Sequence, residues 1–178
     1  MSTGTQATGT QIPIEVYLRS SEYDPDAEYV DGEIEERPAG EFGHADWQAA
    51  ISAWFLSHAK EWNIRVLAEL RVQVSPTRFR VPDVTVLDRA LPVEQVITRP
   101  PLAVFEVLSP QDNVHRLKHK LADYAQMGIP EIWVVDPDAV PGTEKFERYE
   151  NGHLVPATRF AHHAIQFELS QIASLLQG

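Results

Sequence analysis

Residues 102–108 read Leu-Ala-Val-Phe-Glu-Val-Leu and residues 132–135 read Ile-Trp-Val-Val, two apolar runs separated by a segment with helical periodicity. The segment, from about Asn113 to Met127, places apolar side chains on one helix face at Leu117, Leu121, Tyr124 and Ala125. Gly128 follows at a position suited to end the helix. Strand, helix and strand in about 35 residues predict a right-handed crossover joining two parallel strands. The first run suits a central strand covered on both faces.

The rest of the chain adds further strands and helices to this unit. Asp31-Gly32 and Asn151-Gly152 each lie between short extended runs, which predicts two hairpins. Alternating apolar and polar residues predict one strand over residues 64–74, and a second strand is predicted over residues 80–87. Apolar residues spaced from Trp47 to His58 predict an amphipathic helix, and shorter helices are expected over residues 13–18 and 172–176. The predicted fold is α/β, with a central mixed (α+β) sheet flanked by helices.

Length and composition limit the domain organisation. A chain of 178 residues with 43% apolar and 23% charged residues is expected to form one globular domain, over residues 12–178. Residues 1–11 are small and polar apart from Met1 and are predicted to be a disordered tail. The absence of cysteine excludes disulfides, thiolate catalysis, iron–sulfur clusters and cysteine-based zinc sites. No apolar run approaches the ~18 residues of a membrane span, so no membrane partner is expected and the cytoplasm is the expected location.

Charge is distributed unevenly along the chain. The formal net charge is −11, which argues against a polyanionic partner for the surface as a whole. Ten of the fifteen Lys and Arg residues nevertheless lie within residues 60–120. A local surface facing phosphates is one interpretation of this concentration, and solvated charges at strand edges and loops are the other.

Two carboxylates interrupt apolar stretches. Asp83 follows Val81-Pro82 and precedes Val84, and Glu106 lies in the middle of the central apolar run. Unpaired buried carboxylates are costly, and two of them on neighbouring strands would raise each other's pKa unless a cation lies between them. Oxygen ligands without cysteine favour Mg²⁺ or Mn²⁺. The alternative is that each carboxylate caps a loop or pairs with an arginine.

Lys120 is the candidate third member of this site. On a helical wheel centred on the apolar stripe, Lys120 flanks the stripe on the side of Tyr124, whereas Lys118 lies farther away. Lys120 is therefore the lysine better placed to reach the strand ends, where an ammonium could orient water or offset charge on phosphorus. A lysine that merely extends along the surface into solvent is the alternative.

Taken in order, these motifs resemble the Uma2 family, also called DUF820, within the PD-(D/E)XK nuclease superfamily. The resemblance is carried by residues 81–84, residues 106–110, Lys120-Leu121, and residues 124–137 with Gly128, Pro130-Glu131 and Trp133-Val134-Val135-Asp136-Pro137. It also includes residues 29–33 and His44, and it covers about residues 13–176.

The resemblance implies a restriction-endonuclease-like core in which Asp83 and Glu106 bind a divalent metal. It also implies the main-chain carbonyl of Val107 as a ligand and Glu33 as an additional metal ligand. In the D/E-x-K pattern the lysine falls two residues after the acid, but this sequence has Leu108 there. The lysine role must then pass to Lys120. The expected cofactor is Mg²⁺ or Mn²⁺ and the expected partner is DNA, and a homodimer is left open.

The histidines carry weaker signals. His115 and His119 are four residues apart and could share a metal, but no third ligand or glutamate motif accompanies them. His162 and His163 are expected to alternate on a strand without a catalytic role. His44 matches a family position, with a contact at the start of the long helix as its expected role.

Two functions from different classes remain. The first is a metal-dependent endonuclease that hydrolyses DNA phosphodiester bonds with metal-activated water. The second is a catalytically inactive binding or scaffold protein that keeps the nuclease fold, which Leu108 and the net charge favour. The conjunction of Asp83, Glu106 and Lys120 favours the first.

Overall fold

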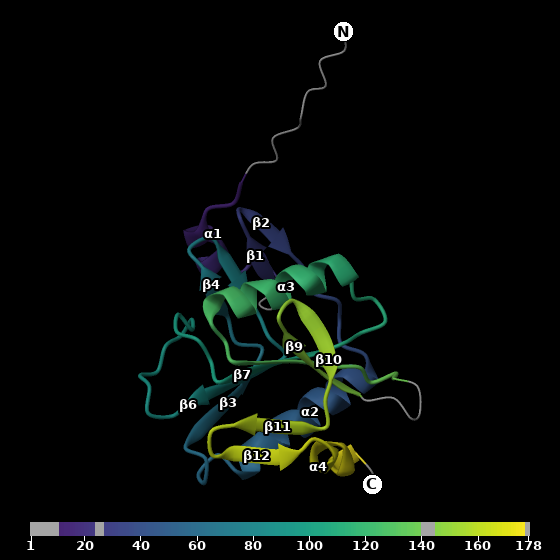
Figure 1. Cartoon of the computed structure of the whole chain (residues 1–178). Coiled ribbons are helices and arrows are strands. Elements are labelled where there is room, and N and C mark those ends of the chain that lie inside the picture. Colours follow the sequence, from purple (N-terminus) through teal and green to yellow (C-terminus); the bar gives the residue numbers. More distant parts are fainter. Residues whose placement is uncertain (1–10, 24–26, 140–144, 177–178) are drawn as a thin grey trace.

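The computed structural model describes residues 11–23, 27–139 and 145–176 (Figure 1). The tail predicted at residues 1–11 therefore lies outside the described residues, except for Gln11. No helix in the described parts of the chain has both the length and the apolar character needed to cross a membrane.

The centre of the fold is a six-stranded mixed sheet in the order β10-β9-β8-β7-β6-β3. Its strands are β3 (Ile64–Ala68), β6 (Val84–Asp88), β7 (Ala103–Val107), β8 (Glu131–Val135), β9 (Phe146–Glu150) and β10 (His153–Pro156). β7 and β8 pair in parallel, and α3 (Val114–Met127) connects them. Asn113 caps this helix through its side chain, and Gly128 ends it with a φ of 92°. The predicted strand–helix–strand unit with two parallel strands is confirmed.

Helices cover both faces of this sheet (Figure 1). On one face lie α2 (Phe42–Ser57), the hairpin of β11 (Arg159–His162) and β12 (Ile165–Glu168), and α4 (Ser170–Ala173) with the short helix η1 (Ser174–Leu176). On the other face lies α3. Phe105 packs on the α2 side, whereas Val104 packs with Leu121 and Tyr124 of α3. Since successive strand residues alternate, Glu106 faces α3 together with Val104.

A second, four-stranded sheet lies on the far side of α3, in the order β2-β1-β5-β4 (Figure 1). It contains β1 (Glu28–Val30), β2 (Glu33–Glu35), β4 (Val72–Ser75) and β5 (Arg78–Arg80), with α1 (Ile14–Arg19) packed against it. The β1–β2 turn has φ values of 50° at Asp31 and 100° at Gly32, as a type I′ turn requires. The same signs occur at Asn151-Gly152, so both predicted hairpins are confirmed.

The predictions of one continuous strand over residues 64–74 and another over residues 80–87 are wrong, because each region is interrupted. The first breaks after Ala68, where Glu69 adopts a φ of 53°, and the second breaks at Val81-Pro82-Asp83. At each break the chain passes between the two sheets. The alternation of buried residues continues on both sides of the first break, whereas residues 79–86, around the second break, are all buried. The β11–β12 hairpin was not predicted. Its turn contains His163, with a φ of 50°, so His162 and His163 do not alternate along one strand.

Candidate active site

A pocket of about 110 Å³ opens between the end of β7, the first half of α3 and the segment that follows β2. The ionisable side chains that line it include Glu28, Arg37, His44, Asp83, Glu106, Arg116 and Lys120. The structure therefore brings Asp83, Glu106, Val107 and Lys120 together at one place. Glu33 is exposed on β2 and is not among the residues that line this pocket.

Asp83 lies where the chain passes from β5 into β6, immediately before the first residue of β6. The residue is 1% exposed, and Oδ2 of its carboxylate accepts a 2.7 Å hydrogen bond from the backbone N–H of Val107. Oδ1 pairs with the guanidinium of Arg37 and lies 3.2 Å from Nε2 of His44. Burial raises the pKa of Asp83, but the hydrogen bond from His44 and the charge of Arg37 outweigh burial and lower it overall. Asp83 is therefore held ionised.

Glu106 projects from β7 toward α3, where two side chains bind its carboxylate. The ammonium of Lys120 lies 2.8 Å from Oε2, and the hydroxyl of Tyr124 donates to Oε1 at 2.6 Å. Burial raises the pKa of Glu106 to about 7, and the negative charges of Asp83 and Glu28 add to this rise against the opposing charge of Lys120. An additional cation near Glu106 would therefore favour its ionised form.

Lys120 is buried, with 8% of its surface exposed, and does not extend along the surface into solvent. The wheel placed it at the edge of the apolar stripe, and the second sheet covers that edge (Figure 1). Its Nζ lies 2.7 Å from Oε1 of Glu28 and donates to the carbonyl oxygen of Val81 at 3.2 Å, in addition to its contact with Glu106. Lys118 is exposed on the same helix. Burial lowers the pKa of Lys120, but Glu106 and Glu28 outweigh burial and raise it.

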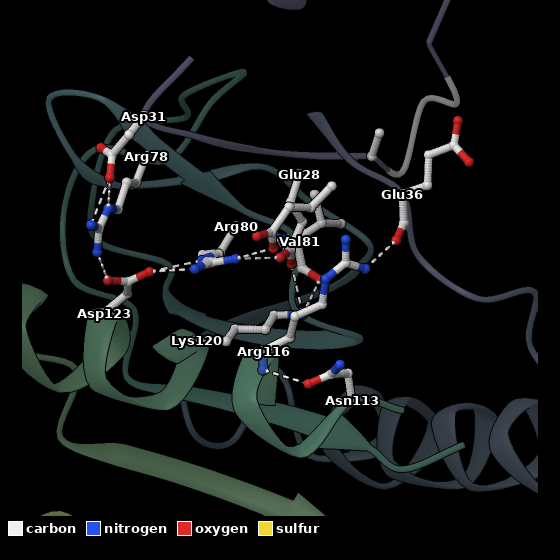
Figure 2. A network of polar contacts seen from close by, with 12 residues as sticks. Glu28, Asp31, Glu36, Arg78, Arg80, Val81, Asn113, Arg116, Lys120 and Asp123 are labelled. Carbon is white, nitrogen blue, oxygen red and sulfur yellow. Dashed lines mark hydrogen bonds and ion pairs between the residues drawn. The ribbon is translucent and has the colours of Figure 1, made fainter. Parts of the chain in front are cut away.

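Beyond Lys120, alternating charges connect the pocket to the tip of the β1–β2 hairpin, in the order Lys120, Glu28, Arg80, Asp123, Arg78 and Asp31 (Figure 2). Arg80 binds Glu28 at 2.9 Å and Asp123 at 2.8 Å, and all three side chains are buried. Arg78 continues the chain from Asp123 to the exposed Asp31. Glu28 thus fixes Lys120 to a buried network between α3 and the second sheet.

Sequence reasoning missed Glu28, Arg37 and the polar role of Tyr124. Glu28 and Glu35 are register partners in the β1–β2 hairpin, and both line the pocket, whereas Glu33 is paired with Val30 near the turn. Arg37 carried a usable signal, since it is one of only two basic residues in the first 59. Tyr124 follows Lys120 by one helical turn, a spacing that places both on the same strip of α3.

The histidines occupy different surroundings from one another. His44 lies in the first turn of α2, inside the helix, and binds Asp83. This hydrogen bond raises the pKa of His44. His115 and His119 are exposed on α3. Within residues 11–23, 27–139 and 145–176, no group of three or more Asp, Glu or His side chains is arranged to hold a metal ion.

The donor set nevertheless fits a hard divalent cation that uses fewer protein ligands. Two buried carboxylates and a residue of the β7 main chain, Val107, face one pocket, and a cationic side chain already lies on each carboxylate. Mg²⁺ is commonly held by one or two carboxylates and keeps several waters, so two carboxylates with one carbonyl would suffice. Asp83, Glu106 and Val107 are the residues that would bind such an ion.

The chain is similar to one protein family and to two solved structures. The family model for Uma2, "Putative restriction endonuclease", matches residues 14–141. A solved structure of a "putative nuclease belonging to DUF820" from Anabaena variabilis ATCC 29413 superposes with a TM-score of 0.73 at 20% identity, covering 92% of this chain and 99% of that one. A DrdV–DNA complex aligns with a TM-score of 0.40 at 18% identity, over 73% of this chain and 11% of that one.

No curated protein matches the chain. The solved DUF820 structure shows the same fold, and the predicted α/β nuclease-like architecture is confirmed. The family model spans most of the chain, including the second sheet, Asp83, Glu106 and Lys120. The chain belongs to the Uma2 family of putative restriction endonucleases.

Proposed function

We propose that this protein is a divalent-metal-dependent endonuclease that hydrolyses DNA phosphodiester bonds at the pocket formed by Asp83, Glu106 and Lys120. The observation that carries the proposal is the placement of two buried carboxylates and a buried lysine at one solvent-accessible pocket, in a chain of a nuclease family. Such a concentration of buried charge is costly for stability and is typical of catalytic sites.

Asp83 and Glu106, with the carbonyl of Val107, are the proposed metal ligands. Oxygen ligands favour Mg²⁺ or Mn²⁺ in this position. When bound, the cation would supply a nucleophilic water at neutral pH and would polarise a phosphoryl oxygen. Glu33 is left out of the proposed ligand set because it is exposed on β2 and outside the pocket lining.

Lys120 takes the role of the lysine that Leu108 cannot supply. Its ammonium reaches Glu106 from α3, although the residue is 14 positions later in the chain. In that place it can hold a positive charge beside the phosphate and offset the negative charge that develops during hydrolysis. Glu28 and Tyr124 position this arrangement, since Glu28 binds Lys120 and Tyr124 binds Glu106.

DNA is the proposed substrate because α3 exposes basic side chains close to the pocket, although the chain as a whole is acidic. Arg116 and Lys118 are exposed on the first half of this helix, next to His115 and His119. Arg116 also lines the pocket. Exposed guanidinium and ammonium groups of this kind bind backbone phosphates independently of base sequence.

Cleavage of supercoiled plasmid with Mn²⁺, with and without a chelator, tests this function. We expect nicking that requires the metal and falls by orders of magnitude in Asp83→Asn and in Glu106→Gln. Asp88→Asn, at the other end of β6, is the matched control and should cleave like wild type. Folded wild-type protein that binds DNA but never cleaves it would favour a nuclease-fold scaffold instead.

A further inference from the structure

Arg37 is a pocket residue to which the proposed chemistry assigns no task. It lies in the segment between β2 and α2, and its side chain is 17% exposed. The guanidinium pairs with Oδ1 of Asp83, and it faces the pocket that Glu106 and Lys120 also line. Arginine keeps its charge at every relevant pH, so this is a permanent cation at the mouth of the site.

The two oxygens of Asp83 have different surroundings. Oδ2 is bound to the backbone N–H of Val107, which is fixed by the sheet. Oδ1 is bound by two side chains, Arg37 and His44. Arg37 and His44 both line the pocket, so Oδ1 is the oxygen that a cation entering from the pocket meets first, and Arg37 already lies on it.

A divalent cation and the guanidinium of Arg37 compete for Oδ1. A carboxylate oxygen has two lone pairs, and here Arg37 and His44 account for both. A divalent ion at contact distance would also repel the guanidinium strongly within a buried site. Metal binding should consequently release Arg37 from Asp83.

The released guanidinium would stay close to the pocket. The carbonyl oxygen of Glu36, the preceding residue, accepts a 3.1 Å hydrogen bond from Nη1 of Arg116 on α3 (Figure 2). The backbone next to Arg37 is thereby tied to Arg116, in the first turn of the helix. A displaced arginine in this place needs a new anion, and a phosphate matches its planar set of donors.

We infer that Arg37 occupies the metal-binding oxygen of Asp83 in the metal-free protein and, once displaced, binds a backbone phosphate of the DNA substrate. This inference rests on the proposed function. It makes Arg37 a phosphate-binding residue whose availability depends on the metal. It also predicts opposite effects on two binding reactions, which a purely structural arginine would not produce.

The test measures both reactions in wild type, Arg37→Ala and Arg116→Ala at pH 8. Calorimetric titration with Mn²⁺ alone should show about tenfold tighter binding in Arg37→Ala, because a competing cation is gone. In the presence of Ca²⁺, Arg37→Ala should bind a labelled DNA duplex about tenfold more weakly than wild type. The slope of log affinity against log salt concentration should also be reduced by about one. Arg116→Ala, which leaves Asp83 untouched, should weaken DNA binding with unchanged Mn²⁺ affinity.

Each alternative result has a defined meaning. Unchanged or weaker Mn²⁺ binding in Arg37→Ala would show that Arg37 does not compete with the metal for Asp83. Unchanged duplex binding would show that Arg37 does not bind a phosphate of the DNA. If Arg37→Ala does not fold, Arg37→Gln is measured against the same expectations. Wild type that binds no Mn²⁺, or binds it equally well as Asp83→Asn, would refute the proposed function itself. The two failures are therefore distinguishable.

Discussion

The hydroxyl of Tyr124 donates a 2.6 Å hydrogen bond to Oε1 of Glu106, inside the interface between α3 and β7. Tyr124 is fully buried and Glu106 is 6% exposed, so this bond is shielded from water. Lys120, one turn earlier on the same helix, binds the other oxygen of the carboxylate. The helix therefore fixes both oxygens of Glu106, and its packing on the sheet is coupled to the geometry of the pocket.

Removing this hydroxyl should measurably destabilise the fold. Tyr124→Phe leaves a buried carboxylate oxygen without its donor, which costs about 1.5–3 kcal/mol for a hydrogen bond to a charged group. Urea denaturation of the two proteins measures the difference. Tyr149→Phe, on the half-exposed strand β9, is the control and should change the free energy of unfolding by less than about 0.5 kcal/mol. An equal free energy of unfolding for Tyr124→Phe and wild type would show that this hydrogen bond does not stabilise the fold.

Lys120 should matter for stability as well as for cleavage, because it is buried between two carboxylates. Lys120→Met leaves Glu28 and Glu106 without their shared cation, and breaking a buried ion pair costs about 3–5 kcal/mol. Lys118→Met, on the exposed side of α3, is the control. We expect Lys118→Met to stay within about 1 kcal/mol of wild type and to retain plasmid cleavage.

Single-turnover cleavage at a temperature where both variants are folded completes the lysine test. Lys120→Met should lose the reaction, whereas Lys118→Met should show only weaker DNA affinity, through one lost phosphate contact. A folded Lys120→Met that cleaves at the wild-type rate would remove Lys120 from the active site. Loss of cleavage in Lys118→Met alone would show that the lysine of the cleavage reaction is Lys118 and that its assignment to Lys120 is wrong.

The two ends of the charge network in Figure 2 should differ sharply in their importance. Glu28 is buried and binds both Arg80 and Lys120, so Glu28→Gln should lower the free energy of unfolding by about 3–5 kcal/mol. Asp31 is exposed at the hairpin turn and binds Arg78, so Asp31→Asn should cost at most about 1 kcal/mol. Chemical denaturation at low salt compares the two variants. Similar losses for both would mean that burial does not determine the strength of this network.

Metal binding should release a proton below neutral pH. The pKa of Glu106 is raised to about 7, mainly by burial, so near pH 6 the metal-free carboxyl is mostly protonated. A metal ligand must be ionised, so Mn²⁺ affinity should rise as pH increases toward 7 and then level off. The pKa of Asp83 is lowered, so Asp83 is already ionised across this range.

Calorimetry in buffers of different ionisation enthalpy counts the released protons. We expect close to one near pH 6 and close to none near pH 8. The pKa of His44 is also raised, through its hydrogen bond to Asp83, so His44→Gln is included to separate the two groups. His44→Gln should still release a proton when Mn²⁺ binds, and Glu106→Gln should not. The reverse pattern would assign the proton to the histidine.

The sequence was sufficient to predict the crossover unit and both hairpins, because their signals are local. The strand of residues 103–107, the helix ended by Gly128 and the turns at Asp31-Gly32 and Asn151-Gly152 each follow from neighbouring residues. The break in the first interrupted strand could not be predicted from alternation, because burial alternates on both sides of it. The second is buried throughout residues 79–86, so no change in burial marks its break. The decisive feature at the first break is the left-handed backbone of Glu69, a residue type that gives no signal for it.

The site was predictable where a charged residue interrupts an apolar pattern, and it was not where the interaction is long-range. Asp83 and Glu106 each stand out in an apolar stretch, and the helical wheel selected Lys120 over Lys118. The burial of Lys120 depends on the second sheet, which packs over α3 from residues about 40 to 90 positions earlier in the chain. Glu28 and Arg37 enter the site through the same long-range packing.

The most direct test of the central claim is an anomalous difference map from a crystal soaked with Mn²⁺. We predict one peak in the pocket, at about 2.1–2.2 Å from an oxygen of Asp83 and from an oxygen of Glu106. The carbonyl oxygen of Val107 should complete the protein ligands, with Arg37 displaced from Oδ1. A peak bound to other residues, or no peak in the pocket at saturating Mn²⁺, would contradict the account.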